Sequence, residues 1–181
     1  MTFHRLRQIL QSIGSRRRAF FLRLVGMKIE GRVWLERIEC PSRPSCISLG
    51  EGAALDRGIT LLATNDDARI VIGARTYINR STMLDASERI EVGEQTMIGP
   101  FCYITDHDHV VGPGLAPGDT PLASKPVIIG KRCWLGANVS VLKGVTVGDG
   151  SVVGAGSVVT KPIPEGVIAV GNPARVLRAI S

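Results

Sequence analysis

Two of the three histidines in this sequence lie two residues apart, in the stretch CYITDHDHVVGPG. The imidazoles of His107 and His109 have an ordinary pKa near neutrality, so either one could act as a general base at pH 7. In an extended segment residues i and i+2 face the same side, so the pair could instead bind zinc. The third histidine, His4, lies far away in the sequence. A solvated loop without chemistry is the remaining interpretation.

Residues 105–126 interrupt a regular pattern that flanks them on both sides, and they begin beside the histidines. The segment is rich in proline and glycine, which suits neither a helix nor a central strand. A long segment without periodicity inside a compact domain is usually functional or disordered. We therefore expect a loop, inserted after Ile104, that closes over a groove or reaches a neighbouring subunit.

The elements that must position this loop repeat every six residues. Each hexad has an aliphatic residue at one position: Leu49, Leu55, Leu61, Ile72, Ile78, Leu84, Val92, Ile98, Ile104, Ile129, Leu135, Val141, Val147, Val153 and Val159. A period of six is not helical, but it is three times the period of a strand. It predicts short flat strands joined by tight turns, with three hexads in each triangular coil. Glycine after many of the aliphatic residues relieves the backbone at the turns.

Each hexad also has a small or branched residue four positions after the aliphatic one. Cys102 and Cys133 occupy this inward position, where a cysteine is most often a buried small hydrophobe. We therefore expect no nucleophilic role for these two thiols. The spacing of Cys40 and Cys46 fits no zinc motif and leaves a disulfide open. Reduced thiols in the cytoplasm are the favoured interpretation.

Most of the positive charge lies in one terminal segment. The chain has 181 residues, of which 44% are hydrophobic and 4% aromatic, and its formal net charge is +6. Residues 1–28 contain seven Arg and Lys and no acidic residue, so the remainder is near −1 (6 − 7). We expect a basic N-terminal arm over 1–28 and a folded domain over 29–181. No apolar run approaches the roughly 20 residues that span a bilayer.

Leu6, Ile9, Leu10 and Ile13 recur in this arm at helical spacing between arginines, which predicts an amphipathic basic helix. Such a helix can lie on an anionic membrane surface, which would place the protein at the periphery of the inner membrane. The other interpretation is a helix that packs on the domain or across a trimer, with its arginines in solvent. No motif supports nucleic acid as a partner.

The stretch GPFCYITDHDH, followed by KPVIIGKRCWLGANVSVLKGVTVGDGSVVGAGSVVTKPIPEGVIAVGNPARVLR, resembles the hexapeptide-repeat sugar O-acetyltransferases. These include the maltose and galactoside acetyltransferases and the acetyltransferases of surface-polysaccharide gene clusters. The resemblance covers about Leu49 to Arg178. It implies an all-β, left-handed parallel β-helix and a homotrimer with active sites between subunits. It also implies acetyl-CoA as donor, a sugar or sugar nucleotide as acceptor, and no metal.

The resemblance implies a single general base just ahead of the long loop. Counting seventeen residues from the hexad at Val92 reaches His109. His107 lies off that position and is a neighbour of unassigned role. The implied reaction is direct transfer, in which a backbone N–H or the side chain of Asn79 stabilises the oxyanion. Asn79 matches the acceptor-binding asparagine of the family, and a turn asparagine in a left-handed conformation is its alternative interpretation.

Further candidates for the acceptor side are two aspartates and an aromatic residue. Asp85 falls one coil from Thr105 in the hexad register, and Asp106 is a similar candidate. Either could orient an imidazole, bind the acceptor or simply solvate a turn. Trp134 lies where the family has an aromatic residue that lines the site. The positions that match the cofactor-binding residues of the family are Asn138, Ala155, Thr160, Lys161, Arg175 and Arg178. Three of these are cations, which suit the phosphates of CoA.

The resemblance leaves the acceptor open. The acidic acceptor-binding residue near the N-terminus of the family has no equivalent here, so the acceptor need not be a simple free sugar. O-acetylation in surface-polysaccharide biosynthesis is the favoured function, and N-acetylation of a nucleotide-linked amino sugar is the alternative. A non-catalytic β-helix binding module is the further alternative. The γ-class carbonic anhydrases share the repeat and bind a metal through three histidines. The wider histidine spacing of that family is absent from this sequence, so we do not expect a metal-dependent hydratase.

Overall fold

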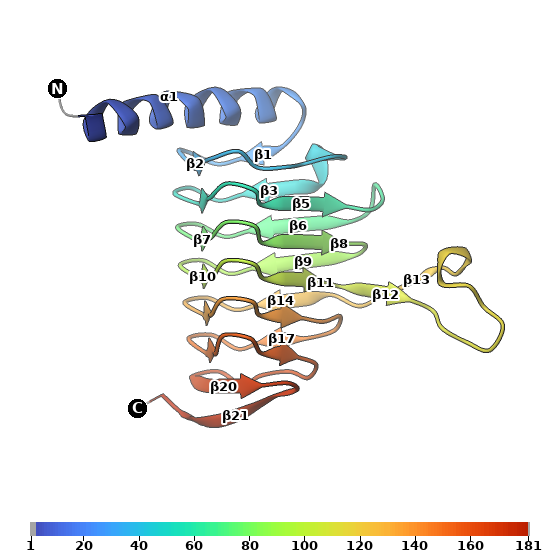
Figure 1. Ribbon diagram of the computed structural model, residues 1–181. Coiled ribbons are helices and arrows are strands. Elements are labelled where there is room, and N and C mark those ends of the chain that lie inside the picture. The colour runs from blue at the N-terminus through green and yellow to red at the C-terminus, as the bar shows by residue number, and fades with distance from the viewer. Residues whose placement is uncertain (1–2, 181) are drawn as a thin grey trace.

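The computed structural model of the protein describes the backbone of residues 3–180 and the side chains of residues 10–116 and 118–180. Its body is a stack of triangular coils (Figure 1). A helix, α1 (Phe3–Leu24), lies across the N-terminal end of the stack, and an arm leaves the side of the stack. The C-terminus lies at the opposite end from α1.

Three sheets form the faces of the stack. The first face contains β1 (Lys28–Ile29), β3 (Ile47–Leu49), β6 (Arg69–Ile72), β9 (Arg89–Val92), β14 (Val127–Ile129) and β17 (Thr146–Val147), with a 3-10 turn, η1 (Pro44–Cys46), before β3. The second face contains β2 (Trp34–Leu35), β4 (Ala54–Leu55), β7 (Tyr77–Ile78), β10 (Met97–Ile98), β15 (Trp134–Leu135), β18 (Val152–Val153), β20 (Val167–Gly171) and β21 (Ala174–Ala179). The third face contains β5 (Thr60–Ala63), β8 (Met83–Ala86), β11 (Tyr103–Thr105), β16 (Ser140–Val141) and β19 (Val158–Val159). All these strands pair in parallel except β21, which runs antiparallel to β20 and closes the second face.

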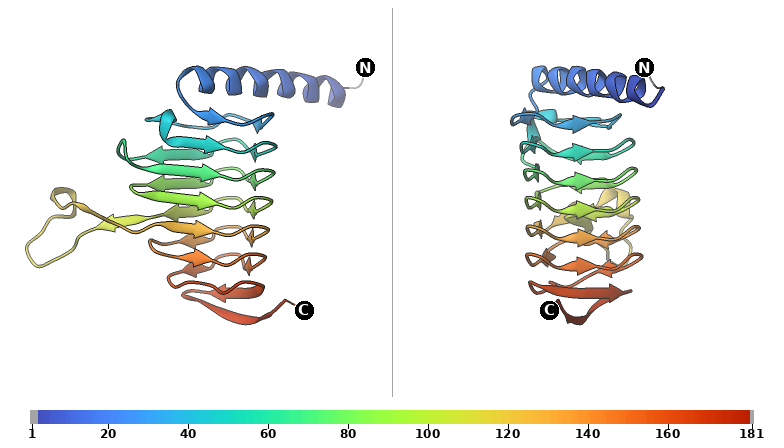
Figure 2. Two further views of the ribbon diagram at one scale, coloured as in Figure 1. Left: turned by 180° about the vertical axis from the view of Figure 1, so that it is seen from behind. Right: turned by 90° about the vertical axis from the view of Figure 1, so that its left-hand side faces the viewer.

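The core of the stack consists of the aliphatic residues of the hexads. All fifteen are buried, and none is more than 2% exposed. They stack in columns along the axis, as Ile72, Val92, Ile129 and Val147 do on the first face. Burial of each such side chain contributes about 1.5–3 kcal/mol relative to exposure. The predicted left-handed parallel β-helix is confirmed (Figures 1 and 2).

The small inward residues join neighbouring coils by hydrogen bonds. Thr76 Oγ1 donates to the carbonyl oxygen of Gly93 at 2.9 Å, and Thr96 Oγ1 donates to that of Gly130 at 2.7 Å. The Thr96 hydroxyl also accepts the N–H of Cys133 at 3.1 Å. These hydroxyls are fully buried, and they are tolerated in the core because each one is paired.

The four cysteines are all free thiols. Cys102 and Cys133 are 2% exposed, and each Sγ donates to the carbonyl oxygen of a glycine in the next coil at 3.2 Å. Burial raises the pKa of both thiols above the ordinary value. Thiolate is the nucleophilic form, so both residues serve packing, as their place in the repeat predicts.

Gly93 lies where two coils touch backbone to backbone. A Cβ at this position would lie 2.5 Å from the carbonyl carbon of Gly130 and 2.6 Å from the nitrogen of Lys131. The Gly93→Ala variant is therefore expected to lose about 1–3 kcal/mol of unfolding free energy, as overpacked cores do. Urea unfolding would measure the loss. Gly118→Ala is the control, because its Cβ meets no atom within 4 Å, and equal midpoints for the two variants would contradict the close coil contact.

The segment after Ile104 begins as a short β-ribbon. β12 (His107–His109) and β13 (Leu122–Ser124) pair antiparallel at its base. A 3-10 turn, η2 (Pro117–Asp119), lies between them in sequence. The whole arm projects sideways from the stack, away from the side over which the N-terminus of α1 extends (Figures 1 and 2). Backbone groups pair across the ribbon at the base of the inserted segment. The segment is irregular only beyond this base.

One face of α1 packs on the first coil. Ser15 and Ala19 are 2% and 4% exposed. The Ser15 hydroxyl accepts the N–H of Leu35 at 2.8 Å, and Arg18 donates to the carbonyl oxygen of Leu35 at 2.7 Å. These bonds satisfy backbone groups at the open end of the stack that have no preceding coil to pair with.

The described part of the predicted apolar stripe, Leu10 and Ile13, does not take part in this packing. Leu10 and Ile13 are 60% and 50% exposed. The side chains of Leu6 and Ile9, which belong to the same predicted stripe, lie outside the described residues. Over residues 3–180, no helix has the length and the apolar character that crossing a bilayer requires.

Candidate active site

A cavity of about 360 Å³ lies where the third face meets the arm. Its lining consists of Asp85, Tyr103, Thr105, His107, Asp108, His109, Leu142 and Lys143. These residues come from β8, β11, β12 and the turn after β16. The strand register explains their meeting, because Thr105 pairs with Asp85, as the hexads predict, and Ile104 pairs with Val141. Coil stacking thus brings three distant segments to one corner.

The Asp106 carboxylate is a buried anchor at the base of the arm. It is 0% exposed. Its Oδ1 accepts the N–H of Ser87 at 2.7 Å, and its Oδ2 accepts those of Glu88 and Arg89 at 2.7 and 2.5 Å. The Asp106 carbonyl oxygen accepts the N–H of Lys125 at 2.7 Å. Asp106 therefore joins the turn of the preceding coil to both ends of the arm, and its carboxylate is shielded from the cavity.

The His107 ring lies between two carboxylates. Its Nδ1 is 3.0 Å from Asp106 Oδ1, and its Nε2 is 3.9 Å from Asp85 Oδ2. The side chain is only 11% exposed. The Nδ1 atom is therefore held by the Asp106 carboxylate, whereas Nε2 faces Asp85 beyond hydrogen-bond distance. This arrangement fixes the ring at the wall of the cavity.

Asp85 and Tyr103 line the cavity beside His107. The Tyr103 hydroxyl donates to Asp85 Oδ2 at 3.0 Å. Burial raises the pKa of Tyr103 above its ordinary value, so the hydroxyl remains a donor at neutral pH. Asp85 Oδ1 is buried and has no hydrogen-bond partner among the described residues. The Asp85 carboxylate is therefore only partly satisfied within one chain.

His109 lies on the exposed part of β12, opposite Leu122. Its ring makes no hydrogen bond with any residue that the structure describes, so a ring nitrogen is free to accept a proton. The neighbouring Asp108 pairs with Lys143, with 2.5 Å between Oδ1 and Nζ. Lys143 also donates to the carbonyl oxygen of Ala123 at 3.2 Å. These contacts tie both strands of the ribbon to the next coil and so position His109.

The other acceptor-side candidates lie along a different edge of the chain. Asn79 follows β7 at the corner between the second and third faces, and Trp134 is 56% exposed on the second face. Asn79 is not the left-handed residue of its turn, because that conformation belongs to Ser81, with φ 56°. The Asn79 Oδ1 accepts the N–H of Arg80 at 2.8 Å. Asn79 and His109 therefore occupy opposite edges of the third face, and one chain does not bring them together.

Four of the candidate cofactor residues lie in two columns toward the C-terminal end. Asn138 and Ala155 occupy the corner between the second and third faces, in successive coils. Thr160 and Lys161 follow β19 at the corner between the third and first faces, two coils beyond Thr105 in the strand register. Thr160 and Lys161 thus share an edge of the stack with the corner cavity, and Asn138 shares an edge with the acceptor candidates.

The remaining two cofactor candidates are arginines on β21. Arg175 and Arg178 are both exposed. Each donates from Nη1 to a neighbouring carbonyl oxygen, at 2.8 and 3.1 Å respectively. Neither of these arginines, nor Lys161, forms an ion pair with any described residue. Their charge is thus available to an anionic ligand at this end of the stack.

Tyr103, Leu142 and Lys143 line the cavity but were not expected from the sequence. The hexad register contains the signal for two of them. It places Leu142 beside Thr105 in the next coil, and Lys143 comes directly after Leu142. Tyr103 looks in the sequence like an outward residue of a short strand, so only its contact with Asp85 reveals its place.

Metal ligands do not gather in the described part of the chain. Among the side chains that the structure describes, no three His, Cys, Asp or Glu could hold a metal ion together. His4 lies outside these side chains. The absence of a metal cofactor therefore stays a prediction from the sequence.

The chain is similar to acetyltransferases of known sequence. A family model described as the hexapeptide repeat of succinyl-transferase matches residues 126–161. WbbJ of Escherichia coli K12, named as a lipopolysaccharide biosynthesis O-acetyl transferase, is 33% identical over 172 residues, which cover 87% of each chain. A protein of Mycobacterium tuberculosis named as an acetyltransferase is 32% identical over 150 residues. That match covers 82% of this chain and 50% of the mycobacterial protein.

A solved structure gives the same result. A hexapeptide-repeat acetyltransferase of Vibrio cholerae, in complex with acetyl coenzyme A, superposes with a TM-score of 0.67 at 29% identity. The superposition covers 74% of this chain and 70% of the other. The match to the hexapeptide-repeat model and the likeness to WbbJ over most of both chains indicate the same family. The chain belongs to the hexapeptide-repeat acetyltransferases.

Proposed function

We propose that this protein transfers the acetyl group of acetyl-CoA to a hydroxyl group of a saccharide in surface-polysaccharide biosynthesis. The observation that carries the proposal is the imidazole of His109, which lines the corner cavity and bonds no described residue, beside a His107 ring whose Nδ1 is held by Asp106. The name of WbbJ supports a hydroxyl acceptor and a polysaccharide product.

His109 is the general base in this proposal. It takes the proton of the acceptor hydroxyl as the hydroxyl oxygen attacks the thioester carbonyl of acetyl-CoA. The new C–O bond forms while the C–S bond breaks, and His109 returns its proton to the leaving thiolate of CoA. The transfer is direct, which agrees with the burial of Cys102 and Cys133 in the core.

Asp85 is the acceptor-binding residue that best fits the cavity. Its carboxylate is held by the Tyr103 hydroxyl and faces His107. This arrangement lets Asp85 fix the orientation of a sugar hydroxyl relative to His109. Asp106 contributes indirectly, because its buried carboxylate holds the turn and the arm in place.

The complete site needs a second copy of the chain. Asn79 and Trp134 lie away from the edge that carries His109. Packing of one stack against another would place the Asn79 edge of one copy opposite the His109 edge of its neighbour. A closed ring of such contacts is a homotrimer, in which the amide of Asn79 or a backbone N–H stabilises the oxyanion.

The donor lies along the C-terminal half of the stack. Lys161, Arg175 and Arg178 are exposed cations without acidic partners among the described residues, and cations suit the pyrophosphate and 3′-phosphate of CoA. Asn138 and Ala155 lie at a corner whose turns expose backbone groups to the pantetheine chain, and Thr160 lies next to Lys161.

Release of free thiol from acetyl-CoA tests the function. We expect turnover with a saccharide from a panel of oligosaccharides, nucleotide sugars and nucleotide-linked amino sugars. The product should carry an ester, which hydroxylamine cleaves. An amide product would establish the N-acetyltransferase instead. Absence of turnover with every acceptor, while acetyl-CoA binds, would contradict the proposed saccharide acceptors.

A further inference from the structure

The outward face of α1 is apolar, although this face points away from the body of the protein. Phe20 and Leu24 are 63% and 69% exposed, in line with Leu10 and Ile13. At 100° per residue, Ile13, Phe20 and Leu24 lie on one stripe opposite the buried Ser15. A helix on a soluble protein normally turns its apolar stripe inward and its polar face outward. The orientation of α1 is the reverse.

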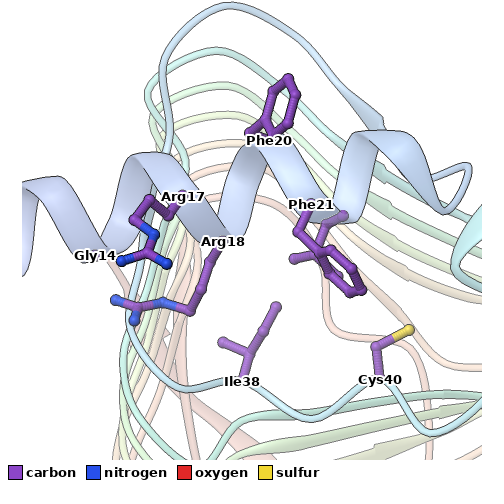
Figure 3. Close-up of a pocket in the computed structure, with 8 residues that line it drawn as sticks. Gly14, Arg17, Arg18, Phe20, Phe21, Ile38 and Cys40 are labelled. Carbon is purple, nitrogen blue, oxygen red and sulfur yellow. The ribbon is translucent and has the colours of Figure 1, made fainter.

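The hollow beside α1 continues this apolar surface. A cavity of about 730 Å³ lies between the helix and the first coil, with Ile38 and Cys40 at its floor. Phe21 points toward these two residues, whereas Phe20 points to the other side of α1 (Figure 3). Arg17 and Arg18 line the same cavity. An apolar hollow with guanidinium groups at its edge suits an amphiphile with an anionic head.

The charge around the apolar stripe has one sign. Residues 1–28 contain seven cations and no acidic residue. Of the described cations, Arg16 and Arg17 are exposed beside the stripe, and neither forms an ion pair with a described residue. A basic helix with an exposed apolar face is the arrangement of helices that lie in the interface of anionic membranes.

We propose that the outer face of α1 docks the protein on an anionic lipid surface. The apolar stripe enters the boundary between headgroups and acyl chains, and the flanking arginines meet lipid phosphates. Because α1 lies across the end of the stack, the stack stands away from the membrane (Figure 1). In the homotrimer, which rests on the proposed function, all three helices would lie at the same end and form one docking face.

Sedimentation of the full-length protein with lipid vesicles tests the docking. We expect binding to vesicles of phosphatidylcholine mixed with phosphatidylglycerol, weak binding to phosphatidylcholine alone, and weaker binding at high salt. The double variant Phe20→Ser/Leu24→Ser should lower the apparent affinity about tenfold or more. Leu177→Ser is the matched control, because Leu177 is 65% exposed on β21 at the opposite end, and it should bind vesicles as the wild type does.

A charge variant separates lipid binding from loss of folding. Arg16→Gln/Arg17→Gln changes only exposed side chains, and it should lose most of the preference for anionic vesicles. Thiol release with a soluble acceptor should persist in both double variants, so failure of docking is distinguishable from failure of the proposed function. Equal binding of the wild type to both vesicle types would overturn the proposal. A change of oligomeric state in Phe20→Ser/Leu24→Ser, without loss of vesicle binding, would instead make this face a contact between copies.

Discussion

Replacement of His109 by alanine is expected to lower kcat for acetyl transfer by about a hundred- to ten-thousandfold, the usual contribution of a positioned general base. The ring of His109 lines the corner cavity, and no described residue occupies its nitrogens. The substitution removes only an exposed side chain from β12, so the ribbon should still form. We expect an unchanged unfolding midpoint and an unchanged Kd for acetyl-CoA, measured by calorimetry.

His107→Ala is the matched comparison, because His107 lies two residues away on the same strand. Its nitrogens face Asp106 and Asp85, so the loss should act through the position of the arm rather than through proton transfer. We expect a smaller decrease of kcat than for His109→Ala. Near wild-type turnover in His109→Ala, together with loss of turnover in His107→Ala, would assign the base to His107.

Replacement of Asp106 by alanine is expected to cost about 3–5 kcal/mol of unfolding free energy, the range for breaking a buried charged network. Three backbone N–H groups of the turn at 87–89 would lose their acceptor in a site that is 0% exposed to solvent. An unpaired buried donor costs about 1–3 kcal/mol. Urea unfolding at a fixed protein concentration would measure the loss, since assembly of the proposed homotrimer would also contribute to stability.

Two variants delimit this prediction. Asp108→Ala removes a carboxylate that is 58% exposed in its pair with Lys143, so its cost should stay below about 1 kcal/mol. Asp106→Asn keeps one acceptor oxygen and should fall between the two. A cost for Asp106→Ala no larger than that for Asp108→Ala would show that the turn does not depend on the buried carboxylate.

The fold could be predicted from the sequence because one physical constraint repeats. Each coil needs one large aliphatic residue and one small residue per strand, and fifteen aliphatic positions in register leave little choice of architecture. The same register predicted the pairing of Asp85 with Thr105, which β8 and β11 confirm. The register predicts contacts between residues about twenty positions apart, because parallel strands of neighbouring coils pair without slippage.

The corner cavity was only partly predictable. The register does not describe the arm, so the sequence could not show that the His107 ring would lie between Asp85 and Asp106. The sequence also could not show that Asp106 is buried rather than exposed on the surface. Its burial depends on three backbone N–H groups of the preceding coil, which donate to its carboxylate. The roles of His109 and the cofactor candidates stay predictions.

The orientation of α1 was also beyond the sequence. The spacing of Leu10 and Ile13 showed an amphipathic helix, but amphipathicity alone does not tell which partner the apolar side meets. The first coil receives Ser15 and Ala19 instead. Small side chains let the helix backbone approach the coil closely enough for hydrogen bonds to Leu35.

The number of coils between α1 and the corner cavity also sets the distance along the stack from the helix to the site. β1 and β9 lie three strand positions apart on the first face, and β9 belongs to the same coil as β11. At about 4.8 Å per strand, the reacting hydroxyl would sit about 14 Å below the first coil. If α1 lies on lipid as proposed, the stack would act as a spacer that sets the distance between the lipid surface and the sugar that reacts. Insertion of one 18-residue coil would move that distance by a single strand spacing.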